Sequence, residues 1–275
     1  SGGIDSSNIV LALSRLGTRI STFSVGFHDK QTDESDYSRV VAKKLNTKHN
    51  QIYIEEKECL KEVTNIMACY DEPFSDPSLL PTFLLSKFVK EKITVALAGD
   101  GADELFGGYD RYNKISKIWK NVKLTPNWIK KNSNLLSFYL GRKELTFIRS
   151  FGKKIRRYSH DDIESLYSDE MSKWRPDENL YQQKDFGKSN FDFKKKFCEK
   201  QVSNYRYLML IDVLTYLPGN LLVKTDRASM FNGVEVRNPF LDHDFVKLIW
   251  RLPDSYLNKN SNKSILRDIL SDYLP

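Results

Sequence analysis

The chain opens with "SGGIDSS" (Ser1–Ser7), and this stretch decides how the rest of the sequence is interpreted. Gly2 and Gly3 permit a tight turn and let backbone N–H groups approach a ligand, because glycine has no Cβ. From Asp5 onward, the spacing of apolar residues predicts a helix over 5–16, with one face formed by Ile9, Val10, Leu13 and Leu16. A helix N-terminus favours an anion, so the sequence predicts a phosphate-binding loop.

Asp5 gives this loop an unusual chemistry. No Gly-Lys-Ser/Thr sequence follows the glycines, so it is not the common nucleotide loop. A carboxylate in the place of that lysine suggests a bridging Mg²⁺, which binds carboxylates together with phosphate oxygens. The hydroxyls of Ser1, Ser6 and Ser7 can donate to phosphate oxygens. Taken alone, the stretch is equally compatible with a glycine-rich turn in which Asp5 caps the helix.

Length and composition are those of a soluble globular protein. The chain has 275 residues, of which 40% are hydrophobic and 29% are charged, enough for one large domain or two smaller ones. It shows no run of about 18 apolar residues, so no transmembrane helix is predicted. No signal peptide is visible at its start. The three cysteines fit neither a disulfide framework nor a zinc site, which favours a cytoplasmic location.

The net charge of +7 is unevenly distributed. Residues 111–160 contain 14 Lys or Arg and one acid, Glu144, so this segment is basic and the rest of the chain is net acidic. Three interpretations remain open: a solvated helical face, steering of small anionic substrates, and nucleic-acid binding. The last is suggested by aromatic residues among the basic ones, namely Tyr112, Trp119, Trp128 and Tyr139.

Strands and helices alternate in the first hundred residues. The pattern predicts strands at 18–27, 49–56 and 93–99, and helices at 34–46, 57–70 and 78–92. Such alternation predicts an α/β fold with a parallel sheet, and the continuous apolar run at 93–99 is typical of a strand covered on both faces. Ligands bind at the carboxyl ends of parallel strands. We therefore expect the site at Ser1–Asp5, Val25–Phe27 and the loop after Ala98, with a further strand upstream of Ser1.

The remainder of the chain differs in pattern. From about Tyr109 to Gln201 the strand signals disappear, which indicates a helical subdomain or an irregular insertion. Helices are predicted at 204–230, with a break at Pro218-Gly219, and at 243–253 and 264–275. We expect three parts: a nucleotide-binding core at 1–110, a basic and mostly helical insertion at 111–202, and a helical part at 203–275 that completes the site.

A second motif, "AGDGADELFGGYDRY" (Ala98–Tyr112), follows the predicted strand at 93–99. Asp100, Asp103 and Glu104 repel one another, so their clustering indicates a cation or a positively charged reactant; the alternative is an acidic first helical turn. Together with Asp5, Asp103 could complete a Mg²⁺ site.

Two further motifs carry charged pairs. In "VEVRNPFLD" (Val234–Asp242), the apolar neighbours of Glu235 and Arg237 predict a buried ion pair. In "NKSILRDIL", Lys263 and Arg267 are four residues apart and share a helical face. As a lone pair, Lys263 and Arg267 indicate no particular function.

Six blocks in order resemble one family: "SGGIDSS", "TFSVGF", "DEPFSDPS", "AGDGADELFGGY", "VEVRNPFLD" and "KSILRDIL…YLP". They are similar to the synthetase domain of glutamine-dependent asparagine synthetases, over residues 1–112 and 203–275. The resemblance implies a parallel sheet with helices on both faces, of the adenine nucleotide alpha hydrolase-like, ATP pyrophosphatase type, with a helical C-terminal part. It also implies that the first strand is missing and that the sequence is a fragment.

The resemblance also implies a site. Its loop would grip the β- and γ-phosphates of ATP, which leave together as pyrophosphate. The residues implied for ATP and pyrophosphate are Ser1, Gly2, Gly3, Asp5, Ser6, Val25, Ala98 and Gly99, and those implied for Mg²⁺ are Asp5 and Asp103. Lys263 would stabilise the charge that develops on the phosphates, and Asp100 would accept a proton from ammonia. Glu235 would lie near the same site.

The implied activity is that of a carbon–nitrogen ligase with glutamine as amido donor. It would adenylate the side-chain carboxylate of aspartate, and ammonia would then form asparagine and AMP. The resemblance implies an N-terminal glutaminase domain absent from this sequence and a homodimer of the complete protein. Two positions depart from the family pattern: Asp100 stands where many members have glutamate, and Ala98 replaces a frequent serine.

Two other functions remain possible from the sequence. One is a related amide-forming enzyme, such as a beta-lactam synthetase-like enzyme or an amidotransferase that acts on another carboxylate. The other is a nucleic-acid-binding module that uses the basic segment 111–160, and phosphate contacts would make such binding strongly salt-dependent.

Overall fold

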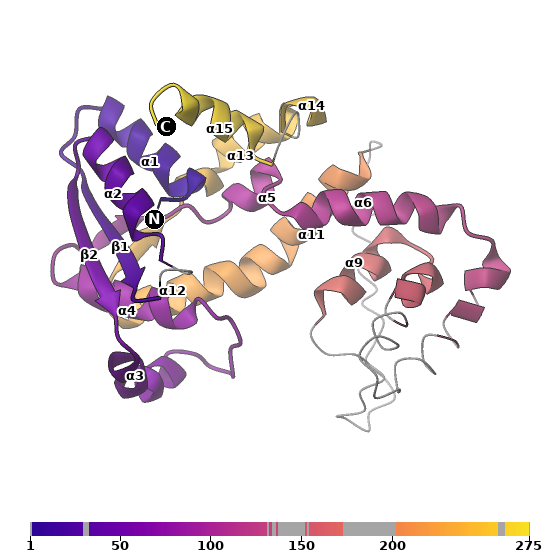
Figure 1. Ribbon diagram of the computed structural model, residues 1–275, viewed down its shortest axis with the longest axis horizontal. Helices are drawn as coiled ribbons and strands as arrows, with labels where there is room; N and C mark the ends of the chain where they lie inside the picture. The colour runs from indigo at the N-terminus through magenta and orange to yellow at the C-terminus, as the bar shows by residue number, and fades with distance from the viewer. Residues whose placement is uncertain are drawn as a thin grey trace. The chain divides into compact units, whose positions relative to one another are not determined.

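A computed structural model describes residues 2–29, 33–130, 132–133, 136, 152, 154–172, 202–257 and 262–274 (Figure 1). The chain divides into two compact units. The first contains Ser1–Gly108 and Asp212–Pro275, and the second contains Tyr109–Ile211. The boundaries expected from the sequence, 110/111 and 202/203, stay predictions, because many of the intervening residues lie outside the described ranges.

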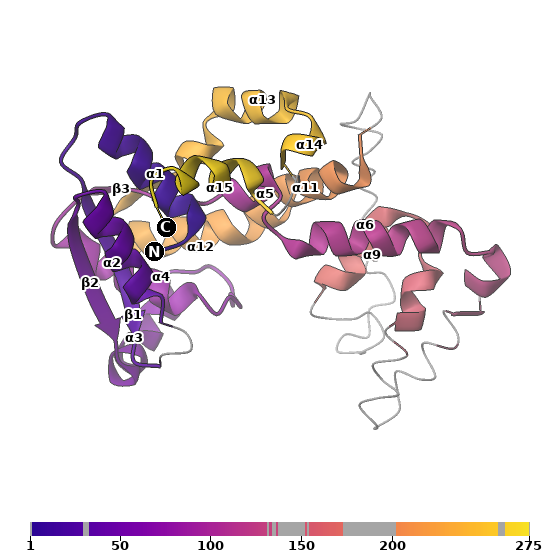
Figure 2. The same cartoon turned by 45° about the horizontal axis from the view of Figure 1, so that its top comes forward.

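The first unit begins with a helix and a parallel strand pair. Helix α1 (Ile4–Arg15) is followed by β1 (Ser21–Phe27), α2 (Ser35–Lys44) and β2 (Lys48–Ile54). Strands β1 and β2 pair in parallel, from Ser21 opposite Lys48 to Phe27 opposite Ile54. These elements lie within three residues of their predicted bounds at each end, and together they form the βαβ unit expected from the alternation (Figures 1 and 2).

Side-chain alternation along β1 assigns a different helix to each face of this strand pair. On one face, the Ser24 hydroxyl lies 3.2 Å from that of Ser38 in α2. On the other, the ring of Phe23 meets that of Phe88 in α4 (Leu79–Lys90) edge-on, with centroids 6.3 Å apart. The expected helices on both faces are therefore present at β1.

A hydrophobic core joins the two stretches of the first unit. Its buried members come from β2, α3 (Glu56–Ala68) and the residue that caps it, α4 and α12 (Leu222–Phe231). They are Ile54, Ile66, Cys69, Phe83, Leu84 and Ala228. Burying the isoleucine, leucine and phenylalanine side chains among them contributes roughly 1.5–3 kcal/mol each. The core therefore holds α12 against the N-terminal βαβ unit, although the two are far apart in the sequence.

The parallel strands form two small sheets. Strand β3 (Val95–Leu97) pairs in parallel with β4 (Glu235–Arg237), which the sequence did not predict. The order is β1-β2 in one sheet and β3-β4 in the other, because no described strand hydrogen-bonds to both β1 and β3. The apolar side chains of β3 are not covered on both faces, since Val95 and Leu97 are each 43% exposed. The α/β class with parallel strands is confirmed.

The helix predicted at 204–230 is not broken at Pro218. Helix α11 (Asn204–Leu214) passes through a wide π-helical turn, η3 (Leu217–Leu221), into α12. Proline has no N–H to donate, and the wider turn accommodates it while the Gly219 N–H donates to the Thr215 carbonyl at 2.9 Å.

This continuous helix corrects the sequence-based expectation about membrane spans. By length and composition, residues 204–231 could cross a membrane. Such a helix alone is weak evidence, because core helices of soluble proteins pass the same test. Here Ala228 belongs to the hydrophobic core, and Lys224, one turn earlier in the same helix, is buried and charged.

A short buried helix lies within the second sequence motif. Helix α5 (Ala102–Phe106) stops at Gly107, whose φ of 66° is in the left-handed region that glycine adopts readily. Phe106 is 1% exposed and meets Phe240 of η4 (Pro239–Leu241) edge-on at 5.9 Å. This packing fixes Asp103 in the first turn of α5. Three further helices complete the unit: α13 (His243–Arg251), α14 (Asp254–Leu257) and α15 (Ser264–Ser271).

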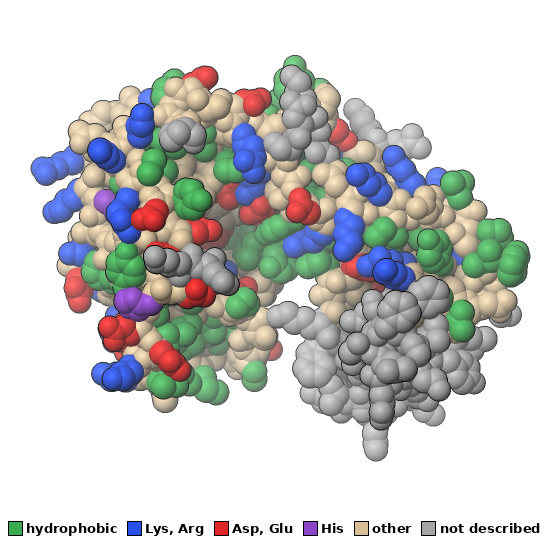
Figure 3. Space-filling model, viewed as in Figure 1, with side chains coloured by type: hydrophobic (Ala, Val, Ile, Leu, Met, Phe, Trp, Pro, Cys, Tyr) green, Lys and Arg blue, Asp and Glu red, His purple; other side chains and the backbone are tan. Residues whose placement is uncertain are grey.

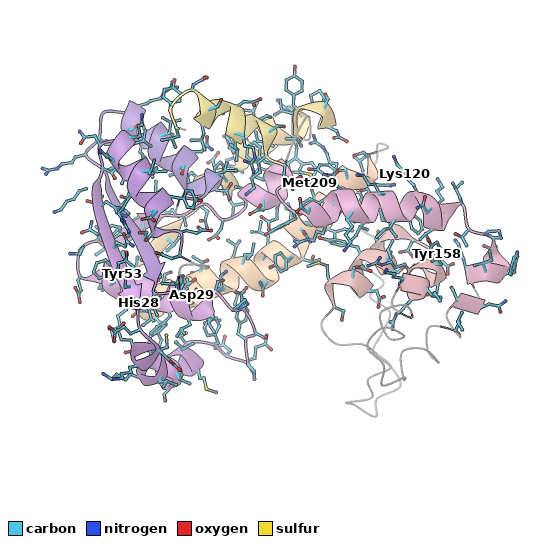
Figure 4. The ribbon with its side chains drawn as sticks, viewed as in Figure 1. His28, Asp29, Tyr53, Lys120, Tyr158 and Met209 are labelled. Atoms are coloured by element: carbon cyan, nitrogen blue, oxygen red, sulfur yellow. The ribbon has the colours of Figure 1, made fainter. Side chains whose placement is uncertain are left out.

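The second unit contains α6 (Asp110–Lys123), η1 (Arg157–Ser159) and α9 (Ile163–Met171). Helix α6 is amphipathic: it buries Tyr112, Ile115 and Val122 and exposes Lys114, Lys117, Lys120 and Lys123. Lysine and arginine side chains are visible over this helix, where Lys120 is labelled (Figures 3 and 4).

Two arginines of the second unit are paired with acids of α9, at 2.8 Å for Arg156 with Asp169 and 2.6 Å for Arg157 with Glu170. These pairs and the exposed lysines of α6 agree with a solvated helical face. Nucleic-acid binding and substrate steering stay predictions, and Tyr139 and Glu144 lie outside the described residues.

Candidate functional site

Three charged side chains from distant parts of the first unit meet at one point, which we name the Lys263 cluster (Asp5, Asp103 and Lys263). The Lys263 ammonium donates to both carboxylate oxygens of Asp5, at 2.8 and 2.7 Å. It also lies 2.6 Å from Oδ1 of Asp103. The lysine side chain is only 10% exposed, so this is a partly buried ion triad with one cation and two carboxylates.

The backbone of each member explains its position. Gly3 is the N-cap of α1, and Asp5 lies in the first turn with its carboxylate directed to Lys263. The alternative in which Asp5 caps the helix is therefore wrong. Lys263 precedes α15 with a φ of 57°, in the left-handed region. This conformation costs a non-glycine residue roughly 1–3 kcal/mol and persists where the surroundings enforce it, as they do at functional sites.

Two glycines make room for the cluster. A Cβ on Gly99 would come within 2.9 Å of the Asp5 Cβ. A Cβ on Gly108 would overlap the Asp103 carboxylate and the Lys263 side chain. The Asn262 side chain donates to the Gly108 carbonyl at 3.1 Å, which ties the segment before Lys263 to the end of the second motif. The sequence predicted no such role for Gly108.

The donor set of the Lys263 cluster fits a divalent cation. Carboxylate oxygens of Asp5 and Asp103 converge on the same ammonium, so they already share one cation position. Hard cations such as Mg²⁺ take carboxylate oxygens together with phosphate oxygens and waters. On the face of the first unit shown in Figure 3, acidic side chains gather beside a shaded hollow near α5. Burial raises the pKa of Asp5, against the opposing charge of Lys263.

Asp100 is held differently. Its Oδ2 accepts a hydrogen bond from the Thr225 hydroxyl of α12 at 3.0 Å. No hydrogen bond to its Oδ1 from any described residue is present, so this oxygen is available as an acceptor. Burial raises the pKa of Asp100, while the Thr225 hydrogen bond and the charge of Lys224 oppose the rise.

The residue before Thr225 connects Asp100 to the start of α4. The Lys224 ammonium donates to the Ser78 hydroxyl at 2.6 Å and lies 3.8 Å from Oδ2 of Asp76. We name Asp76, Ser78, Asp100, Lys224 and Thr225 the Asp100 cluster. Sequence reasoning missed Asp76, Ser78, Lys224 and Thr225. Their only signal is the pair of polar motifs "DPS" and "KTD", which resemble ordinary helix starts and solvated charges.

The predicted phosphate loop is compact. Backbone atoms of Gly2 pack against Tyr37, so tightly that a Cβ on Gly2 would overlap the Cβ of that tyrosine. The Gly3 carbonyl accepts from the Ser7 N–H at 3.1 Å and from the Ser6 hydroxyl at 3.2 Å. Ser1 lies outside the described residues. Gly99 brings the second loop against Asp5, and the preceding Ala98 N–H donates to the Arg237 carbonyl at 3.0 Å.

Val25 and Glu235 are not brought to the Lys263 cluster by any described contact. Val25 lies opposite Ile52 in the strand pair, and its side chain packs on the hydrophobic core. Glu235 lies opposite Val95, at the start of β3 rather than its carboxyl end.

The predicted buried Glu–Arg pair in the third motif is wrong. The Arg237 Nε donates to Glu235 at 2.7 Å, but the two side chains are 65% and 52% exposed. The reason is strand alternation, since residues two apart share a face and Val236 between them points the other way.

Two features outside these clusters are notable. The ring of His28, the residue after β1, stacks on that of Tyr53 in β2 with centroids 5.6 Å apart. Both residues are labelled in Figure 4. Asp242, His243 and Asp244 form a group that could hold a metal, but all three are exposed. Asp242 caps α13 by accepting from the backbone of Asp244 at 3.0 Å.

Comparison with known proteins agrees with this geometry. The family model described as asparagine synthase matches residues 1–275. The chain is 29% identical to asparagine synthetase [glutamine-hydrolyzing] 1 of Bacillus subtilis, in an alignment that covers 100% of this chain and 43% of that protein. It is 30% identical to a putative asparagine synthetase [glutamine-hydrolyzing] 2 of Methanocaldococcus jannaschii, over 84% of this chain and 44% of that protein. The chain thus spans less than half the length of these relatives.

Proposed function

Because the chain belongs to the asparagine synthase family, we propose that it carries the synthetase site of a glutamine-hydrolysing asparagine synthetase. The reaction at this site is the ATP-dependent conversion of a carboxylate, that of the aspartate side chain, into an amide. One observation carries the proposal: Lys263 joins Asp5 of the first loop to Asp103 of the second loop, at 2.6–2.8 Å.

In the first half-reaction, a carboxylate oxygen of aspartate attacks the α-phosphorus of ATP and pyrophosphate leaves. The loop of Gly2, Gly3 and Ser6, together with Ser1, holds the departing phosphates at the N-terminus of α1, where N–H groups favour an anion. Lys263 balances the charge that develops on them. Asp5 and Asp103 would hold Mg²⁺, which when bound supplies further neutralisation of phosphate charge.

In the second half-reaction, the nitrogen of ammonia attacks the acyl carbon of the aspartyl adenylate. A C–N bond forms, the C–O bond to the phosphate breaks, and AMP leaves with the bonding electrons. The surplus proton of the attacking nitrogen passes to a base. Asp100 is suited to this role, because its Oδ2 is held by Thr225 and its Oδ1 accepts no hydrogen bond from the described residues.

The remaining site residues have supporting parts in the proposal. Val25, Ala98 and Gly99 contact the nucleotide through backbone groups; Val25 lies within β1, and Ala98 and Gly99 follow β3. Glu235 has the weakest support, since it lies at the start of β4 and is bound to Arg237. The relatives are named as glutamine-hydrolysing, and less than half of each is matched by this chain, which supports a glutaminase part outside the matched region that supplies ammonia. A cytoplasmic location is part of the same proposal.

The test is exchange of labelled pyrophosphate into ATP by the full-length protein, with Mg²⁺ and one candidate carboxylate at a time. The proposal expects exchange that requires aspartate, and asparagine and AMP in equal amounts when ammonium is added. Exchange that requires a different carboxylate would instead support a related amide-forming enzyme. Absence of exchange with every carboxylate would contradict the proposed chemistry itself.

A further inference from the structure

Asp100 reaches the site from a short, fixed segment of backbone. It follows β3 and stands between Gly99 and Gly101. Gly99 is against Asp5, and Gly101 is against Leu241, where a Cβ would overlap that side chain. Because both flanking residues are closely packed, the Asp100 backbone has little freedom. The remaining freedom lies in the torsion of its carboxylate, and the direction of Oδ1 depends on what holds Oδ2.

The hydroxyl of Thr225 holds Oδ2 of Asp100. The Thr225 Oγ1 donates to Oδ2 of Asp100 at 3.0 Å from the first turn of α12. One oxygen of the carboxylate is thus occupied, and the other accepts no hydrogen bond from the part of the chain that the structure describes. A carboxylate held in this way presents one lone-pair face in a fixed direction.

The position of Thr225 is itself fixed by its neighbour. Lys224 is 9% exposed, and its ammonium donates to Ser78 at 2.6 Å while its carbonyl accepts from the Tyr70 hydroxyl at 2.9 Å. Asp76, in turn, accepts from the Asn220 side chain at 3.0 Å. The start of α12 is therefore anchored through side chain and backbone, which makes Thr225 a rigid donor.

We infer that Thr225 is a positioning residue for amide formation: its hydroxyl orients Asp100 so that Oδ1 faces the attacking ammonia. The inference rests on the proposed function, since it assigns Asp100 the proton of the second half-reaction. Adenylation needs no base at this position, so Thr225 affects only the second half-reaction. Aspartyl adenylate that waits for a poorly oriented base is hydrolysed by water, which releases AMP and aspartate without asparagine.

The experiment compares Thr225→Val, which keeps the shape and removes the donor, with Thr225→Ser, which keeps the donor. Each is measured in the full-length protein with ammonium as nitrogen source. For Thr225→Val we expect pyrophosphate exchange within about twofold of the wild type. Asparagine formation should fall about tenfold or more, the scale of one lost hydrogen bond to a charged group, and the ratio of AMP to asparagine should rise. Thr225→Ser should restore both.

Three outcomes overturn the inference. They are an unchanged ratio of AMP to asparagine in Thr225→Val, an equal loss of exchange and asparagine formation, and a Thr225→Ser variant as impaired as Thr225→Val. Thr64→Val is the matched control, because Thr64 is exposed on α3. If Thr225→Val proves unstable in a thermal melt, the ratio in Thr225→Ala decides the question. A wild type without exchange would contradict the proposed function, which separates that failure from this one.

Discussion

The two clusters of the first unit hold their carboxylates by different means. In the Lys263 cluster, two carboxylates share one ammonium at 2.6–2.8 Å, so charge pairing holds the group together. In the Asp100 cluster, a neutral hydroxyl holds the carboxylate at 3.0 Å, and the lysine is 3.8 Å from a different acid. Paired charges suit a site at which cations and phosphates bind and are released. A carboxylate held by a hydroxyl keeps a fixed direction, and its second oxygen accepts no hydrogen bond from the described residues, which suits a base.

The largest expected effect lies in the Lys263 cluster. Asp5→Asn or Asp103→Asn removes one of the two charges that converge on a single cation position, and either variant should abolish pyrophosphate exchange. The fold should remain, because the amide is nearly isosteric with the carboxylate. Asp268→Asn is a suitable control, since Asp268 is exposed on α15, the helix that Lys263 begins. Exchange at the wild-type rate in Asp5→Asn or Asp103→Asn would contradict the assignment of these carboxylates to the cation site.

The next effect separates the two clusters by half-reaction. Lys263→Ala should slow pyrophosphate exchange by about 10²–10³-fold, the scale of one lost electrostatic donor to a developing charge. Asp100→Ala should leave exchange nearly intact and reduce asparagine formation by about 10²–10⁴-fold, the usual scale of general-base assistance.

Both variants should be followed by thermal melts. Lys263→Ala leaves the carboxylates of Asp5 and Asp103 without their cation, and removing one partner of a buried ion pair destabilises by about 3–5 kcal/mol. Lys263→Ala is therefore assayed well below its melting temperature. If Asp100→Ala and Lys263→Ala lose exchange to the same extent, the division of labour between the clusters is wrong.

The two clusters also differ in how far the sequence revealed them. Asp5 and Asp103 lie in glycine-rich motifs that already suggested a cation site, although each motif alone had a structural alternative. Lys263 gave no signal of its own, and the resemblance to a known family joined it to the two acids before their contacts were known. Thr225 and Lys224 lie inside an ordinary helical pattern. Their partners, Asp100 and Ser78, are more than a hundred residues away, and no local period of a sequence encodes such a contact.

The fold, too, was predictable from the sequence only where local side-chain periodicity determines it. Strand and helix positions near the N-terminus follow from side-chain periodicity, so β1, α2 and β2 were predicted within three residues. Strand β4 has only three residues, Glu235–Arg237, with charges on one face, and it exists because it pairs with β3. The wide turn at Pro218 also depends on packing, because proline alone predicts a break.

The smallest expected effect concerns stability and pH in the Asp100 cluster. Burial raises the pKa of Asp100 above its ordinary value, so the folded protein holds this proton more tightly than the unfolded chain does. Stability associated with the group is therefore fully present below the unfolded pKa and is lost as pH rises through the folded pKa. Asp100→Asn cannot ionise and keeps the shape and an oxygen acceptor for Thr225. It should melt close to the wild type at low pH and slightly above it near neutral pH, by about 1 kcal/mol or less, because carboxylates at functional sites often reduce stability. Thermal melts of the wild type and Asp100→Asn, from low to neutral pH, test this prediction. A variant that is less stable than the wild type at neutral pH would show that Thr225 and Lys224 outweigh the burial of this charge, and that the Asp100 cluster is held together by charge as firmly as the Lys263 cluster.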